Sequence, residues 1–227
     1  MRLTTLLVAN AWMTAGALQA NLACAQGTAV ATTLPPATSA TSMTQQAPSD
    51  IIQSAAQRTL TEMQSNRNVY RKDPSKVRPL VDKYLLPHFD TEYAARLVLG
   101  QYWRTTNQEQ RKRFIDAFYH SLLTNYASAL IEYTPDQLKV FPTPVDPSTD
   151  HATVRTEVTG HNADRIAMYY SMHMTPEGWK VYDVNVDGIS YVKSYREDFG
   201  SQIQQQGFDS LIAHLEEREK PTDPRRK

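Results

Sequence analysis

The sequence predicts an α+β fold in which helices from both ends of the chain cover one curved antiparallel sheet of about four strands. Apolar residues recur at helical spacing over 50–133 and again over 189–219, whereas the segment between them alternates with a period of two. That segment divides into short runs separated by turns, which is typical of an antiparallel meander. Helices, meander and helices, in that order, indicate an α+β domain.

The ends of the chain have compositions that set them apart from this domain. Residues 1–25 carry a single charge, an apolar stretch and a final small-x-small triplet, which together predict a secretory signal peptide. Residues 26–48 are uncharged and rich in Thr, Ala, Ser and Pro, so we expect a disordered linker. Residues 218–227 form a charged tail. The folded domain is therefore expected over 49–217.

Cysteine content and net charge restrict the classes of function. Cys24 is the only cysteine, so cleavage after Ala25 leaves no disulfide, iron–sulfur cluster or cysteine-ligated zinc in the mature chain. Cys24 could alternatively be a lipoprotein acceptor, although Asn21 stands where such a sequence has an aliphatic residue. The 24 basic residues balance the 24 acidic ones, which argues against a nucleic-acid partner.

Four helices are expected before the sheet, over 50–64, 74–89, 91–103 and about 107–133. We expect Ser49 to cap the first, Pro87 to end or kink the second, and Asp90 or Thr91 to cap the third. The fourth carries two adjacent apolar rows, wider than the stripe of about 100° on an ordinary surface helix. This width predicts burial on two sides or an aromatic wall that faces a concave surface.

Four strands are expected over 137–141, 151–158, 163–174 and 178–186, followed by helices over 189–206 and 208–219. The even positions of the third strand are apolar and rich in methionine, namely Ile166, Met168, Tyr170, Met172 and Met174. Methionine adapts its shape, so this face suits a deformable ligand such as an acyl chain. Simple gap-filling in a solid core is the alternative.

Residues 183–188, D-x-N-x-D-G, match the first half of a calcium-binding EF-hand loop. Such a loop needs a bidentate Glu at its twelfth position, and here that position is Ser194. Val184 and Val186 alternate with the polar residues as in a strand. We therefore interpret this segment as a strand end with a turn at Gly188.

Signatures of enzymes are missing from the sequence. There is no nucleophile elbow, phosphate loop, dinucleotide fingerprint or metal-binding histidine spacing. NTF2-like enzymes can nevertheless hold an Asp/His general base in a cavity, and His173 with Asp183 is the pair that would do so here. Alternation places both on the face opposite the methionines, so the sequence favours a protein that is not an enzyme.

Three stretches resemble the MlaC, or toluene-tolerance, family of periplasmic phospholipid-binding proteins: LVLGQYW (97–103), QRKRFIDAF (110–118) and YDVNVDGIS (182–190), together with the pair Phe199-Gly200. The resemblance covers about 50–217 and is weakest over 136–177. It implies an NTF2-like fold with an internal apolar cavity that holds the acyl tails of a glycerophospholipid as cargo. It implies no cofactor.

The resemblance also implies a role in the periplasm. Family members carry phospholipid between the outer and inner membranes and so maintain outer-membrane asymmetry. The implied partners are an outer-membrane lipoprotein complex and an inner-membrane ABC transporter with an MCE-type ring. A lipid-independent envelope adaptor with a filled core is the alternative.

Residues on the apolar faces of the predicted helices and strands are the candidates for lipid binding. They are Leu97, Leu99, Phe118, Leu122, Tyr126, Val140, Val154, Ile166, Met168, Tyr170, Met172, Val184 and Val186. Arg165 or Lys180 could meet a phosphate at the cavity mouth, or be a solvated surface charge. Gly100 and Gly188 could be flexible points or ordinary turn glycines.

Overall fold

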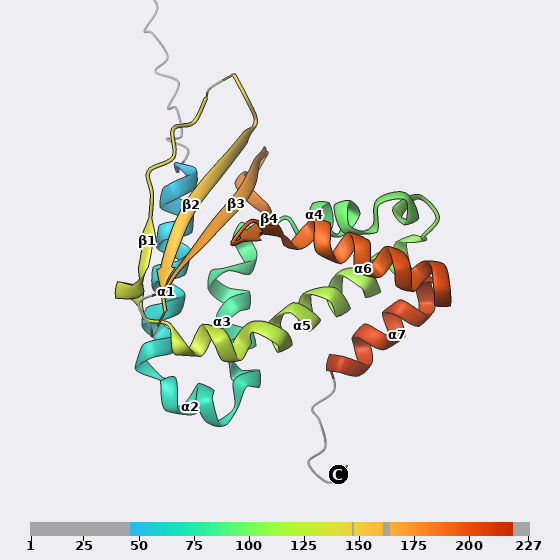
Figure 1. Cartoon of the computed structure of the whole chain (residues 1–227), viewed down its shortest axis with the longest axis horizontal. Coiled ribbons are helices and arrows are strands. Elements are labelled where there is room, and N and C mark those ends of the chain that lie inside the picture. Colours follow the sequence, from blue (N-terminus) through green and yellow to red (C-terminus); the bar gives the residue numbers. More distant parts are fainter. Residues whose placement is uncertain (1–45, 147, 161–163, 220–227) are drawn as a thin grey trace, which may run out of the picture. The chain divides into compact units, whose positions relative to one another are not determined.

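The computed structural model describes residues 46–146, 148–160 and 164–219, which belong to one unit of the chain (Figure 1). The predicted signal peptide, 1–25, lies outside the described residues. So do nearly all of the predicted linker, 26–48, and most of the predicted tail, 218–227. Within the described residues, no helix combines the length and apolar character needed to span a bilayer.

Helices precede and follow the sheet, as predicted. Those before it are α1 (Pro48–Ser65), α2 (Arg67–Lys72), α3 (Val77–Tyr84), α4 (Thr91–Leu99) and α5 (Gln108–Glu132), and those after it are α6 (Tyr191–Gln206) and α7 (Phe208–Glu219). Short 3-10 segments lie at Pro74–Lys76, Leu86–His88, Gly100–Arg104 and Pro135–Gln137.

Capping side chains explain where α4, α5 and α6 begin. Asp90 accepts a hydrogen bond from the backbone N–H of Tyr93 at 2.8 Å, which confirms it as the cap of α4. Asn107 and Gln110 form a capping box at the start of α5. The prediction for Ser49 is wrong, because α1 already begins at Pro48, whose fixed φ suits the first helical turn.

The region between α1 and α4 departs most from the predicted helices. Of the helix expected over 74–89, only α3 is α-helical, and Pro87 lies in the 3-10 turn that follows it. Helix α2 was not predicted. Its six residues are too few to show a helical period, although it buries Tyr70.

The sheet is an antiparallel meander in chain order: β1 (Leu138–Val140), β2 (His151–Thr159), β3 (Arg165–Thr175), β4 (Gly178–Val186) and β5 (Ile189–Ser190). The fifth strand has two residues, which the sequence pattern had assigned to the following helix. Asp187 and Gly188 form the turn before β5 and both have positive φ, 48° and 89°, as a two-residue I′ hairpin requires. Ser190 then caps α6.

A β-bulge divides the inner face of the sheet, which is the face that α1 covers. Ser171 pairs with Asp183 but Met172 pairs with Val181, so Tyr182 is the extra residue of β4. The predicted alternation of even residues therefore holds at Val184 and fails from Tyr182 backwards. Beyond the bulge, Val181 and Trp179 join the buried cluster of Met172.

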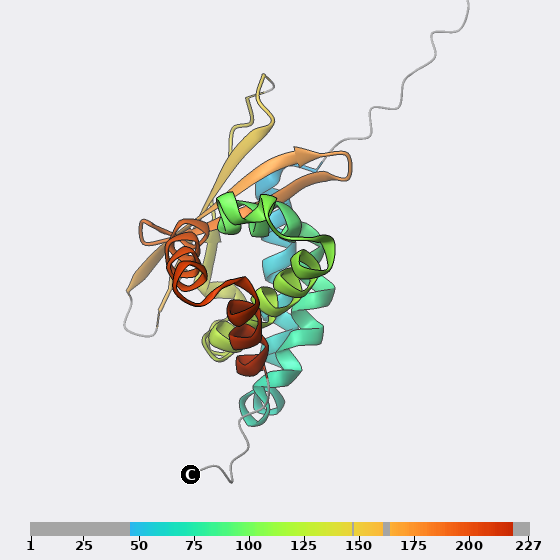
Figure 2. The same ribbon diagram turned by 90° about the vertical axis from the view of Figure 1, so that its right-hand side faces the viewer.

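Two layers of helix stabilise the domain. Helix α1 packs on β1 and β2, while α4 and α6 pack on β4 (Figure 1). Figure 2 shows α7 beside α5, while α6 contacts both α7 and β4. Phe114, Phe118 and Phe199 meet there with ring centroids 5.5–5.9 Å apart. We call this aromatic core between α4, α5, α6 and α7 the packed cluster.

Candidate functional site

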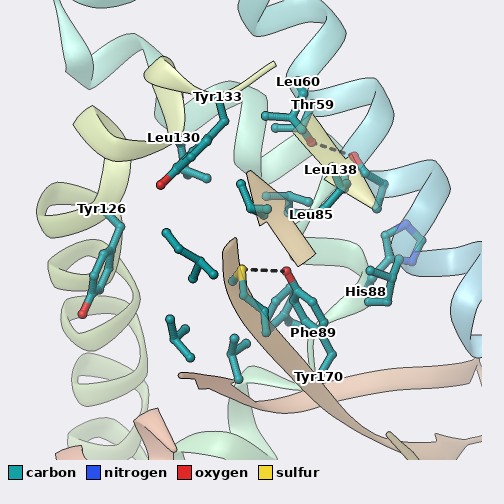
Figure 3. A pocket seen from close by; sticks show the side chains of 18 of the residues that line it. Thr59, Leu60, Leu85, His88, Phe89, Tyr126, Leu130, Tyr133, Leu138 and Tyr170 are labelled. Atoms are coloured by element: carbon teal, nitrogen blue, oxygen red, sulfur yellow. Dashed lines mark hydrogen bonds between the residues drawn. The ribbon is translucent and has the colours of Figure 1, made fainter. Parts of the chain in front are cut away.

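A cavity of about 370 Å³ lies between the inner face of the sheet, α1 and the C-terminal half of α5 (Figure 3). This volume is typical of small-molecule sites. Its wall consists of Ile52, Ala55, Ala56, Thr59, Leu60, Leu85, His88, Phe89, Tyr126, Leu130, Tyr133, Thr134, Leu138, Val158, Ile166, Met168, Tyr170, Val184, Val186 and Tyr191.

The wall of the cavity is apolar and uncharged. No Asp, Glu, Lys or Arg is among the described residues that line it. The hydroxyl of Thr59 donates to the Ala55 carbonyl at 2.8 Å, and that of Thr134 donates to Gln137 Oε1 at 2.9 Å. Because both hydroxyls are satisfied locally, they present little polarity to the cavity. Such a wall suits hydrocarbon and disfavours a charged ligand group.

The wall residues on the sheet point inward and yet are only partly buried. Their side chains stay partly exposed because they face the hollow, as at Ile166, Met168, Val184 and Val186. On the same sheet face, Val154 and Met172 are 0% exposed. The contrast shows that one part of this face is covered by protein atoms and another part is not.

The structure brings six of the predicted residues together on the cavity wall. They are Tyr126, Ile166, Met168, Tyr170, Val184 and Val186. The strand register explains the grouping, since Met168 pairs with Val186 and Tyr170 with Val184. Their contact with lipid remains a prediction.

The structure places the other seven predicted residues away from this wall. Leu99 and Phe118 belong to the packed cluster, and Leu122 packs against it. Val154 and Met172 belong to a second filled core with Trp179, and Val140 packs against that core. Leu97 is partly buried on α4, where its carbonyl accepts a hydrogen bond from Arg196. Apolar periodicity marks all seven as inward-facing but does not distinguish a filled core from a hollow one.

Several wall residues were not predicted. The α1 residues Ile52 and Leu60 already showed helical spacing, and Leu138 and Val158 belonged to the apolar even positions of the sheet. These signals could have identified them. Tyr133 caps the end of α5 and Tyr191 begins α6, and both reach the wall through the tertiary arrangement, which no local pattern indicates.

Two of the tyrosines on the cavity wall stack on each other beside α5. The rings of Tyr126 and Tyr191 stack with centroids 5.4 Å apart, and Tyr126 is 37% exposed. Burial raises the pKa of Tyr191 well above its ordinary value, and the neighbouring Tyr126 hydroxyl raises it further. Tyr191 therefore stays neutral, in keeping with an uncharged wall.

His88 connects the cavity to a second, more polar pocket. It lines both, and Lys180 lines the second pocket while donating to the Pro87 carbonyl at 2.6 Å. Burial lowers the pKa of His88, and the charges of Lys180 and Arg58 lower it further. Arg165 lies exposed at the start of β3 and is not part of either wall.

The hypothesis of a His173–Asp183 general base is wrong in its pairing. His173 Nε2 lies 3.0 Å from Asp90 Oδ2, whereas Asp183 accepts hydrogen bonds from the Ser190 hydroxyl at 2.6 Å and the Val192 N–H at 3.0 Å. The register puts His173 opposite Lys180 instead. His173 is also not on the wall of the cavity.

Residues 183–188, whose sequence matches half of an EF-hand loop, have a structural role. Asn185 Oδ1 accepts from the Gly188 N–H at 2.9 Å, and Asp187 Oδ1 accepts from the Ala167 N–H at 3.1 Å. With Asp183 bonded to the start of α6, the oxygens of this segment stabilise a hairpin and a helix cap. The positive φ of Gly188, and of Gly100 at the end of α4, identifies both as turn glycines.

Comparison with known proteins agrees with these features. The model of the MlaC protein family matches residues 53–217. The chain is 27% identical to the intermembrane phospholipid transport system binding protein MlaC of Haemophilus influenzae, over 78% of this chain and 84% of that protein. It is 29% identical to the toluene tolerance protein ttg2D of Pseudomonas putida, over 72% and 76% of the two chains.

A solved structure is similar as well. It is the phospholipid-binding protein of Ralstonia solanacearum in complex with a phospholipid, with a TM-score of 0.69 and 26% sequence identity. The similarity covers 75% of this chain and 96% of that one. Since the family model spans most of the chain and the fold agrees, this protein belongs to the MlaC family.

Proposed function

We propose that this protein is a periplasmic carrier that holds glycerophospholipid by its acyl chains and moves it between the outer and inner membranes. The observation that carries the proposal is the uncharged, apolar cavity between the sheet and α1. The relatives named for intermembrane phospholipid transport and for phospholipid binding support it. The protein holds its lipid without chemical turnover.

The free energy of acyl-chain burial defines how such a carrier must work. A phospholipid with two long chains has about 30 methylenes, and their transfer from water is worth on the order of 20 kcal/mol. Spontaneous release into water is therefore negligible. Lipid has to pass directly from the cavity to another apolar surface, so release requires a docked partner that favours an open state.

Two partners would complete the route. We propose an outer-membrane lipoprotein complex as the donor or acceptor on one side and an inner-membrane ABC transporter with an MCE-type ring on the other. The relative from Haemophilus influenzae is named as the binding protein of an intermembrane phospholipid transport system, and this name supports the arrangement.

Lipid analysis of the purified protein tests the proposal. Protein isolated from a bacterial envelope should carry copurified phospholipid in stoichiometric amount, detected by native mass spectrometry and by lipid extraction. A lipid-free protein that still binds envelope partners would instead support the adaptor alternative. Turnover of a substrate that is lost on substitution of His173 would support the enzyme alternative.

A further inference from the structure

One polar group of the cavity wall lacks a strong hydrogen-bond partner. Tyr170 projects from β3 into the cavity, and its hydroxyl donates to the thioether sulfur of Met168 at 3.8 Å (Figure 3). A thioether is a weak acceptor. The hydroxyl is therefore available for a better acceptor that enters the cavity.

A second hydroxyl lies beside it. Thr156 is 0% exposed, and within the described part of the chain its Oγ1 has no well-formed hydrogen bond. It is near enough to Tyr170 to act on the pKa of the phenol, which burial raises and Thr156 partly lowers again. Buried hydroxyls are normally satisfied, so the weakly bonded hydroxyl of Tyr170 on the wall, with the buried hydroxyl of Thr156 behind it, indicates a missing ligand atom.

The opposite wall provides an internal comparison. Thr59 of α1 also lines the cavity, but its hydroxyl donates to the Ala55 carbonyl at 2.8 Å. Figure 3 shows this bond as well as the longer contact of Tyr170. The hydroxyl of Thr59 therefore has no unmet hydrogen-bonding capacity, in contrast to that of Tyr170.

The position also lies toward a polar boundary of the cavity. Tyr170 and Phe89 pack against the same buried cluster. His88, next to Phe89 in the chain, lines both the cavity and the more polar pocket that contains Lys180. A lipid with its acyl chains on the apolar wall would have its polar part at this boundary.

We infer that Tyr170, with Thr156 beside it, donates a hydrogen bond to an acyl carbonyl oxygen of the bound lipid and so fixes how deep the chain inserts. The inference rests on the proposed carrier function. A polymethylene chain offers no acceptor, and a phosphate would bring an unpaired charge to an uncharged wall. A carbonyl is a neutral acceptor that suits a neutral donor. The carbonyl belongs to an ester of the bound glycerophospholipid, because a free fatty acid would bring an ionised carboxylate to the wall.

Competition between an ester and an ether lipid tests the inference. The full mature chain is incubated with vesicles that hold equal amounts of a diacyl phospholipid and its dialkyl ether analogue, with the same head group and chain length. Native mass spectrometry then gives the ratio of the two bound lipids, whose masses differ. Wild type should favour the ester by about two- to tenfold, the range expected for one neutral hydrogen bond.

Three variants identify the group responsible. Tyr170→Phe, which removes one oxygen, should bring the ratio close to one, and Thr156→Val should move it in the same direction. Thr59→Val, which removes a satisfied hydroxyl from the opposite wall, should keep the wild-type ratio. Lipid-free Tyr170→Phe should unfold at the wild-type temperature or above, because it loses only a bond to a thioether; a purely structural hydroxyl would lower that temperature.

The other outcomes separate this inference from the proposed function. Equal binding of both lipids by wild type, or an unchanged preference in Tyr170→Phe, overturns the role of Tyr170 and leaves the carrier function intact. A third arm with free fatty acid reassigns the carbonyl if only that ligand depends on Tyr170, which overturns the ester assignment. If wild type takes up no lipid, the carrier function fails and this inference fails with it.

Discussion

Along β3 and β4, the inner face of the sheet is hollow on one side of the β-bulge and filled on the other. On the hollow side, Met168 and Ile166 line the cavity. On the filled side, Met172 is 0% exposed and packs with Trp179 and Ile51. The residues come from one strand and one alternating pattern, so residue type does not create the hollow. The difference arises from what covers each part of the sheet.

Helix α5 shows the same contrast along its length. Its first half places Phe114 and Phe118 in the packed cluster, where they stack with centroids 5.6 Å apart. Its second half places Tyr126 and Leu130 on the cavity wall. A helix that is anchored in a solid core at one end can support an empty space at the other. This division suggests that stability and lipid binding can be perturbed separately.

The largest expected difference is between two arginine substitutions on β3, one in the filled core and one at the cavity. Met172→Arg buries an unpaired charge in a filled core and should cost more than about 4 kcal/mol, enough to abolish folded protein. Met168→Arg puts the same side chain at the hollow and should leave a folded protein that has lost its lipid. Soluble yield, thermal unfolding and native mass spectrometry measure both effects.

Each variant controls for the other, because both replace methionine on the same strand. Equal loss of folding would mean that the cavity end is as tightly packed as the filled end. Normal lipid loading of Met168→Arg would place Met168 outside the lipid site.

A smaller difference is expected from truncation to alanine. Phe114→Ala in the packed cluster should lower the free energy of unfolding by about 3–5 kcal/mol. Ile166→Ala on the cavity wall should fall at or below the lower end of about 2–5 kcal/mol, because its side chain already lacks neighbours on one side. Denaturant unfolding of the lipid-free proteins measures both values. A larger loss for Ile166 than for Phe114 would contradict the division of the molecule.

The smallest effect concerns pH and the cavity wall at His88. Its pKa is lowered in the folded protein from an ordinary value of 6.5. As the pH falls through 6.5, the unfolded state binds this proton before the folded state does, so stability decreases. His88→Gln should therefore lose less stability than wild type between about pH 7 and pH 5. Parallel curves of unfolding temperature against pH would show that His88 does not carry this effect.

Local patterns in the sequence were sufficient for the order of elements and for the residues that face inward. Asp90 as the cap of α4, the turn at Gly188 and the meander all follow from rules that act over a few residues. The short helix α2 and the break-up of the 74–89 helix do not, because six-residue segments and proline-bounded turns carry too little periodicity.

The composition and periodicity of the sequence by themselves determined an α+β domain with an apolar, methionine-rich sheet face, because backbone geometry imposes the periods of 3.6 and 2 on any buried surface. Only the tertiary structure decided where that surface encloses a cavity. The bulge at Tyr182 changes which β4 residues face inward, and the packing of α1 and α5 leaves a cavity in front of Met168 and Tyr170. Whether an inward-facing side chain meets another side chain or an empty space depends on residues far away in the chain.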